Sequence, residues 1–255
     1  MLHTLRHGPA TADRPPVVIA HGLFGSARNW GAIARSLGDD RAVVAVDLRN
    51  HGQSPWNPRH GYDDLAGDLA EVLTAEGRAA DLIGHSMGGK AAMVLALRRP
   101  DLVRRLAVID IAPVAHDHSQ LGLIAAMRAL DLSGLTGRAE ADRRLSADVA
   151  DPMVRGFLLQ SLDLRADPPR WRLNLDALEA NMPAIMGWPA PPGQFAGPAL
   201  FLAGGGSDYV RPEHRPAIRA QFPAARIVRI PGAGHWLHAE APEATAATLR
   251  AFLDA

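Results

Sequence analysis

The stretch Ala80-Asp81-Leu82-Ile83-Gly84-His85-Ser86-Met87-Gly88 decides the fold of this chain. Its first four residues form a short run typical of a β-strand, and residues 87–98 have a helical pattern. Between them, G-x-S-x-G places a serine on a sharp turn from strand to helix. Small residues flank such a serine because the backbone passes close to its neighbours there. The pattern therefore predicts that Ser86 is a nucleophile at the end of a strand.

The same alternation of strand and helix continues on both sides of this segment. Strands are predicted at 17–20, 42–46, 106–109, 199–203 and 226–230, and helices at about 28–38, 63–77, 211–222 and 241–254. Near-continuous apolar strands suit a parallel sheet covered on both faces, and the alternation implies right-handed βαβ units. We therefore predict an α/β fold with a mostly parallel, doubly wound sheet flanked by helices.

Residues 113–192 interrupt this rhythm, because their apolar residues recur at helical spacing without a convincing strand. The exit of this segment, residues 187–193, is rich in proline and glycine and is typical of a linker. An independent helical domain is disfavoured because the strand pattern resumes afterwards. We predict that 113–192 is a helical lid segment, inserted between the sixth and seventh strands over the carboxyl ends of the strands. Residues 1–112 and 193–255 then form the core.

The composition excludes several classes of function. The chain has 255 residues with 27 basic and 27 acidic side chains, and zero net charge argues against nucleic acid as the main partner. The absence of cysteine excludes disulfides, thiolate metal sites and a cysteine nucleophile. No apolar run approaches the ~20 residues that span a bilayer, and no signal-peptide core is visible. We expect a soluble, cytoplasmic protein, and the oligomeric state stays open.

A second motif overlaps the serine turn and gives a competing hypothesis. Gly84, Gly89 and Lys90 match the first seven positions of a phosphate-binding loop, but the next residue is Ala91. The hydroxyl that would bind Mg²⁺ in such a loop is therefore missing. The nucleotide-binding hypothesis is disfavoured for this reason.

Four further segments carry a resemblance to a known family. They are H-G-L-F-G-S at 21–26, D-L-R-N-H-G-Q-S at 47–54, I-D-I-A-P at 109–113 and G-A-G-H-W at 232–236. Together with the serine turn they resemble the α/β-hydrolase superfamily, and most of all the YbfF-type small carboxylesterases. The resemblance covers nearly the whole chain outside 113–192 and implies the α/β-hydrolase fold with a catalytic triad.

The triad is expected in the chain order serine, acid, histidine. Ser86 is the predicted nucleophile and His235, after the last strand, the predicted base. Two residues compete for the acid: Asp208 follows the strand 199–203, the usual position in this fold, and Asp110 ends the strand 106–109. The resemblance to YbfF-type esterases implies Asp110 as the acid, assisted by Ser207. We favour Asp110 and keep Asp208 as the alternative.

The remaining site residues are expected around Ser86. The backbone N–H groups of Met87 and Leu23 should form the oxyanion hole, with Phe24 as the alternative to Leu23. Apolar side chains that could line an acyl pocket are Phe24, Leu123, Met127, Met182, Met186, Trp188 and Trp236. Those in the lid segment could equally form the core of that segment.

These residues predict hydrolysis of small to medium acyl esters or thioesters through an acyl-enzyme. C–C bond hydrolysis and cofactor-free perhydrolysis use the same triad, so the fold does not distinguish them. A non-catalytic binding protein would not need all three residues. His116-Asp117-His118 and the pair His235 and His238 lack a further ligand at a recognised spacing. No metal or cofactor is therefore expected.

Overall fold

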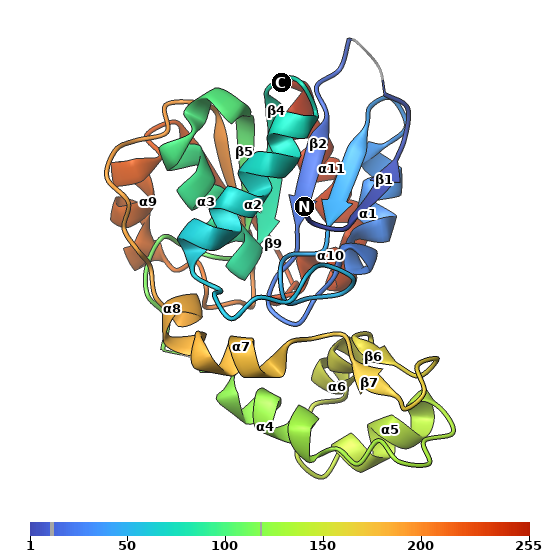
Figure 1. Ribbon diagram of the computed structural model, residues 1–255. Helices are drawn as coiled ribbons and strands as arrows, with labels where there is room; N and C mark the ends of the chain where they lie inside the picture. The colour runs from blue at the N-terminus through green and yellow to red at the C-terminus, as the bar shows by residue number, and fades with distance from the viewer. Residues whose placement is uncertain (11–12, 118) are drawn as a thin grey trace.

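The computed structural model describes residues 1–10, 13–117 and 119–255 and contains a seven-stranded main sheet (Figure 1). Its strands follow the spatial order β1-β3-β2-β4-β5-β8-β9. Their bounds are Thr4–His7 (β1), Val17–Ala20 (β2), Val43–Val46 (β3), Ala80–His85 (β4), Val103–Ile109 (β5), Ala199–Gly204 (β8) and Ala225–Ile230 (β9). All neighbouring pairs are parallel except β1 with β3. The predicted mostly parallel α/β sheet is confirmed.

Strand β1 was not predicted from the sequence. It lies at the edge of the sheet, antiparallel to β3, and its side chains are exposed or only partly buried. The buried strands read as continuous apolar runs because helices cover both of their faces. An edge strand such as Thr4–His7 has no such run, so its sequence gives a weaker signal.

Helices cover both faces of the sheet because side chains alternate along each strand. In β2, Val18 and Ala20 join one buried cluster with α2 (Tyr62–Ala75), α3 (Met87–Arg98) and α9 (Arg215–Gln221). Val17 and Ile19 join the other cluster with α1 (Gly31–Leu37) and α11 (Pro242–Asp254). Short helical turns complete the core: η1 (Ala27–Trp30), η2 (Pro100–Leu102), η3 (Pro212–His214) and α10 (Leu237–Glu240).

The lid segment forms a separate layer at one end of the sheet (Figure 1). Its elements are α4 (Leu121–Ala129), α5 (Arg138–Leu145), α6 (Pro152–Leu159), β6 (Leu162–Asp163), β7 (Arg170–Trp171), α7 (Leu175–Ala180) and α8 (Met182–Met186). The two-residue strands pair with each other, so the segment is not wholly helical as expected. Strands this short leave too little alternation in the sequence to be recognised.

The position of the lid segment in the chain also needs a correction. It connects β5 to β8, which are the fifth and sixth strands of the described main sheet in chain order. The expected position between the sixth and seventh strands is therefore one strand too late. No helix within the described parts of the chain is both long and apolar enough to cross a bilayer.

Candidate active site

Ser86 occupies a strained turn between β4 and α3. Its backbone has φ 51° and ψ −119°, a conformation that residues with a β-carbon rarely adopt and that costs on the order of 1–3 kcal/mol. Glycines make the turn possible: a Cβ on Gly88 would lie 2.4 Å from the His21 carbonyl oxygen, and one on Gly84 equally close to the Gly88 oxygen. The turn therefore holds the Ser86 side chain at the start of α3, where the helix dipole is positive.

His235 pairs with Asp110 rather than with Asp208. Its Nδ1 lies 2.7 Å from Asp110 Oδ2, and the Asp110 side chain is fully buried. The Ser207 hydroxyl donates to the same oxygen, and the Gly204 N–H donates to Oδ1 at 3.0 Å. Three donors thus satisfy a carboxylate that would be costly to bury alone. With the His235 proton on Nδ1, its Nε2 is the nitrogen that can accept a proton.

In the described structure, Asp208 makes no polar contact with this cluster. Its side chain is exposed and has no hydrogen bond or ion pair with any residue in the described ranges. Ser207, one residue earlier, points inward to Asp110, so the next side chain points outward. The structure therefore brings Ser207 and Asp110 to His235 and leaves Asp208 in solvent.

The expected oxyanion hole lies between the turn 22–25 and the start of α3. Met87 is the first residue of α3, so its N–H has no acceptor within the helix. The Phe24 N–H donates to His51 Nε2 at 3.2 Å and is already occupied. For the Leu23 N–H, no acceptor is found among the residues that the structure describes. This difference favours Leu23 over Phe24 as the second donor.

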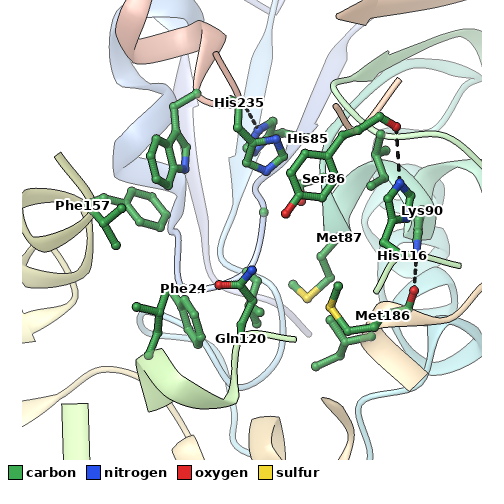
Figure 2. Close-up of a pocket in the computed structure, with 18 of the residues that line it drawn as sticks. Phe24, His85, Ser86, Met87, Lys90, His116, Gln120, Phe157, Met186 and His235 are labelled. Atoms are coloured by element: carbon green, nitrogen blue, oxygen red, sulfur yellow. Dashed lines mark hydrogen bonds between the residues drawn. The ribbon is translucent and has the colours of Figure 1, made fainter. Parts of the chain in front are cut away.

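Ser86, His235 and the expected oxyanion-hole residues line one cavity of about 300 Å³ (Figure 2). The core lines it with Leu23, Phe24, Ser86, Met87 and His235, and the lid segment with Leu123, Val154, Phe157 and Met186. Figure 2 shows Ser86 and His235 close together, with Phe157 and Phe24 on one side of the cavity and Lys90 and His116 on the other. The reactive groups therefore face a mainly apolar space that the lid segment closes.

Comparison with known proteins identifies the family. The model of the alpha/beta hydrolase family matches residues 17–248. The chain belongs to the alpha/beta hydrolase family. It is 42% identical to the sn-1-specific diacylglycerol lipase ABHD11 of Mus musculus over 250 residues, 94% of this chain and 81% of that protein. It is 41% identical to Esterase YbfF of Escherichia coli (strain K12) over 244 residues, 95% and 94% of the two chains.

A solved structure also resembles this alpha/beta hydrolase over nearly its whole length. A marine microorganism esterase has a TM-score of 0.93 and 38% sequence identity, and the match covers 98% of each chain. The predicted α/β-hydrolase fold and the resemblance to YbfF-type esterases are thereby confirmed.

The pocket residues of this hydrolase were predicted only in part. Phe24, Leu123, Met186 and Trp236 line the cavity, but Met127, Met182 and Trp188 do not. Met127 and Met182 are about 1–2% exposed within the larger buried apolar cluster, and Trp188 is half-buried against the same cluster. Helical spacing shows that a residue is apolar on one face, but not whether that face turns to the cavity or into the segment itself.

Several cavity residues were missed. They are Tyr62, Lys90, Ile111, His116, Gln120, Val154, Phe157, Ile185 and Tyr209. Val154 and Phe157 lie three residues apart on α6, and this spacing was a usable signal. Tyr209 stacks on His235 with ring centroids 4.1 Å apart, so it steadies the imidazole through packing.

Lys90 does not behave as the lysine of a phosphate-binding loop. Its Nζ is buried and donates to the backbone oxygens of Met186 at 2.9 Å and Gly187 at 2.6 Å. Burial lowers the pKa of Lys90 from 10.5 to about 7. The ammonium group thus connects α3 of the core to the end of α8 in the lid segment.

The neighbouring histidines are structural supports. His85 Nε2 donates to the His235 backbone oxygen at 2.9 Å, and burial holds the pKa of His85 well below its ordinary value. His85 is therefore neutral and packed beneath the serine turn. Across the described ranges, no cluster of three or more His, Asp or Glu side chains could hold a metal ion, and His118 lies outside them.

Proposed function

We propose that this ester-hydrolysing enzyme is a serine carboxylesterase that cleaves small to medium acyl esters or thioesters by two-step acyl transfer. The proposal rests on the buried hydrogen bond between His235 Nδ1 and Asp110 Oδ2, at the end of the cavity where Ser86 lies. A serine is a good nucleophile only when a positioned base takes its proton.

In the first step, Ser86 Oγ transfers its proton to His235 Nε2 and attacks the carbonyl carbon of the ester. The carbonyl oxygen becomes an oxyanion that accepts hydrogen bonds from the Leu23 and Met87 N–H groups. Asp110 stabilises the imidazolium that forms on His235. His235 then gives its proton to the leaving oxygen or sulfur, and the alcohol or thiol departs from the acyl-enzyme.

In the second step, a water molecule takes the place of the leaving group. His235 removes a proton from this water, and the resulting hydroxide attacks the acyl carbon. The second tetrahedral intermediate collapses when His235 returns the proton to Ser86 Oγ. The carboxylic acid is released and the enzyme is restored.

The cavity supports a limited substrate size. A volume of about 300 Å³ lies at the lower end of ligand-binding pockets, and most of the residues on its lid side are apolar, with His116 and Gln120 as exceptions. Relatives carry the names esterase and sn-1-specific diacylglycerol lipase, which favours oxygen esters over the C–C bonds or peracids that the same triad could process. We therefore place small and medium acyl esters first and thioesters second.

The test combines a fluorophosphonate probe with an ester assay. We expect one stoichiometric adduct on Ser86 by intact mass and peptide sequencing. Ser86→Ala should take up no probe and lose activity toward a chromogenic ester by about 10⁶-fold in kcat. Ser36→Ala, which alters an exposed serine on α1, is the matched control and should behave as wild type. Wild-type hydrolysis by Ser86→Ala would refute the proposal.

A further inference from the structure

The turn that presents the Leu23 N–H has an unusual backbone. The Gly25 N–H donates to the Gly22 oxygen at 3.0 Å and closes a four-residue turn. Phe24, the third residue, has φ 63°. A positive φ at that position is typical of a type II turn, where glycine is preferred. Because Phe24 carries a side chain, something outside the turn must hold this conformation.

Both backbone groups of Phe24 have such an outside partner. The Phe24 N–H donates to His51 Nε2 at 3.2 Å, and the Phe24 oxygen accepts from Ser161 Oγ at 2.7 Å. His51 fixes the peptide plane between Leu23 and Phe24, the unit that follows the Leu23 N–H. Ser161 belongs to the lid segment, and His51 belongs to the loop after β3.

The second ring nitrogen of His51 also makes a hydrogen bond. Its Nδ1 lies 2.9 Å from the Arg49 oxygen, and the side chain is fully buried. A carbonyl can only accept, so Nδ1 carries the proton and Nε2 offers its lone pair to Phe24. The ring therefore has one tautomer and one orientation, both set by backbone groups.

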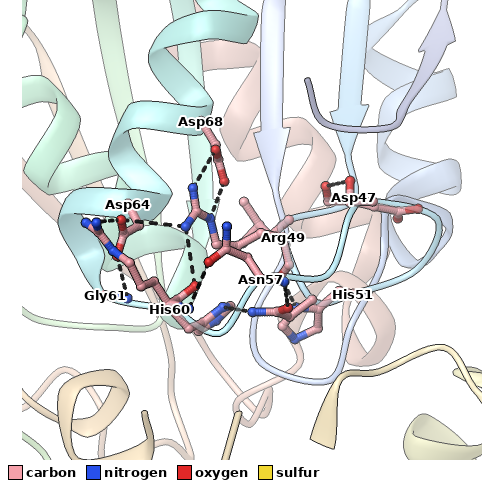
Figure 3. A network of polar contacts seen from close by, with 12 residues as sticks. Asp47, Arg49, His51, Asn57, His60, Gly61, Asp64 and Asp68 are labelled. Atoms are coloured by element: carbon pink, nitrogen blue, oxygen red, sulfur yellow. Dashed lines mark hydrogen bonds and ion pairs between the residues drawn. The ribbon is translucent and has the colours of Figure 1, made fainter. Parts of the chain in front are cut away.

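The loop that carries His51 is anchored to the core (Figure 3). The Arg49 guanidinium donates to both carboxylate oxygens of Asp68 on α2, at 2.6 and 2.8 Å. A continuous series of contacts thus runs from α2 through Arg49 and His51 to the turn. His21 supports the turn from its other side, since its Nδ1 donates to the Gly22 oxygen at 2.7 Å and its Nε2 accepts the Leu48 N–H.

We infer that His51 is a positioning residue for the oxyanion hole. It accepts the Phe24 N–H, holds the turn in its positive-φ form and thereby directs the Leu23 N–H to the place where the oxyanion develops. It does not touch the reacting atoms. The inference rests on the proposed function, because it assumes that Ser86 attacks a carbonyl beside this turn.

The test compares two substitutions of His51. His51→Leu removes the acceptor, whereas Gln can place its Oε1 near the position of Nε2, so His51→Gln retains one. A displacement of about 1 Å in a catalytic donor can cost about 10²-fold, so we expect His51→Leu to lose about that in kcat with KM changed less than about 3-fold. His51→Gln should recover most of the loss.

An inhibitor distinguishes a role in positioning from a role in folding. A boronic acid forms a tetrahedral adduct with a reactive serine and places an oxygen in the oxyanion hole, whereas a product acid does not require that geometry. We expect the affinity of His51→Leu for the boronic acid to fall in parallel with kcat, and its affinity for the product acid to stay within about 3-fold. Loss of both affinities together would overturn the inference.

His214→Leu is the matched control. His214 is also a buried histidine that accepts a backbone N–H at 3.2 Å, here from Arg211, and it does not line the cavity. It should lower Tm as His51→Leu does but leave kcat near wild type. Equal kcat losses in the two variants, or wild-type kcat in His51→Leu, would overturn the inference.

Two further results keep the test decisive. If His51→Leu does not fold, Ser161→Ala removes the donor to the Phe24 oxygen, and we expect a kcat loss of about 3- to 10-fold. Wild-type kcat in that variant would then count against the inference. Failure of the proposed function is distinguishable, because Ser86→Ala would remain active whatever happens at His51.

Discussion

The core side and the lid side line the same cavity but are organised by different forces. On the core side, polar groups are fixed by hydrogen bonds, and Asp110 alone accepts three. On the lid side, Leu123, Val154 and Phe157 offer apolar surface without directed contacts. From this difference we expect the core to determine which reaction occurs and the lid segment to determine which substrate fits. If this division is correct, substitutions on the two sides should alter different kinetic constants.

The largest expected effect on kcat comes from substituting the proposed acid on the core side. Asp110→Asn should leave His235 in the wrong tautomer and lower kcat by about 10⁴-fold. Asp208→Asn alters an exposed carboxylate and should change kcat by no more than about 2-fold. Steady-state kinetics on one ester, with Tm as the control for folding, decides between them. A larger loss in Asp208→Asn would reverse the assignment of the acid.

The lid side should show a smaller, substrate-dependent effect. Phe157 lines the cavity and packs on Trp236 with ring centroids 5.3 Å apart. Phe157→Ala removes apolar contact worth about 1.5–3 kcal/mol, so kcat/KM for medium-chain esters should fall about 10- to 100-fold while acetyl esters change little.

The control for this lid prediction lies on the same helix. Met153 is 54% exposed and does not line the cavity, so Met153→Ala should leave the chain-length profile unchanged. A uniform loss across all chain lengths in Phe157→Ala would contradict the division, because it would mean that the lid side also controls the chemical step.

The smallest effect concerns the contact that joins the two sides. Lys90 is the only lysine of the chain, and its pKa is about 7 in the folded state instead of 10.5. Between pH 7 and pH 10.5 the unfolded chain holds a proton on Lys90 that the folded chain has lost. The free energy of unfolding therefore rises with pH in this range. The slope for one proton is at most about 1.4 kcal/mol per pH unit.

Denaturant unfolding between pH 7.5 and 9.5 measures this slope, and Lys90→Met should flatten it. Because there is one lysine, an NMR signal from ¹³Cε-labelled lysine reports its titration directly. A midpoint near 10.5 in the folded protein would show that the ammonium group is not held in the buried contact with Met186 and Gly187.

Much of the fold could be predicted because its signals are local. The buried strands are continuous apolar runs, and Gly84 is required by its close contact with Gly88, a neighbour in the same motif. Strand β1 was not predicted, because an edge strand need not be apolar. Met127 and Met182 were misplaced because the rotation of short helices depends on neighbours that the sequence does not reveal. Trp188 lies in the segment after α8, and its direction likewise depends on contacts that form only in the folded chain.

The choice between Asp110 and Asp208 as the proposed acid could not be made from the residues and their spacing. Asp110 and Asp208 both follow a strand and both fit the order serine, acid, histidine. What separates them is the path of the backbone after β5 and β8: the Asp110 N–H bonds to the Leu202 oxygen, and Ser207 turns inward. A loop-fixing hydrogen bond of His51 could be expected from its place in a turn, but its partner could not, since only the folded chain brings its Nε2 to the Phe24 N–H.

If Asp110 acts as the proposed acid, its three donors also bear on when activity can arise during synthesis of the chain. Two come from the end of β8 and the loop after it, and the third from beyond β9, whereas Asp110 itself directly follows β5, before the lid segment. Contacts over such sequence separations form late in folding. A nascent chain can carry Ser86 on its finished turn and still have no base to activate it. We therefore expect esterase activity only in molecules whose whole sheet is assembled, and no activated serine in partly folded chains.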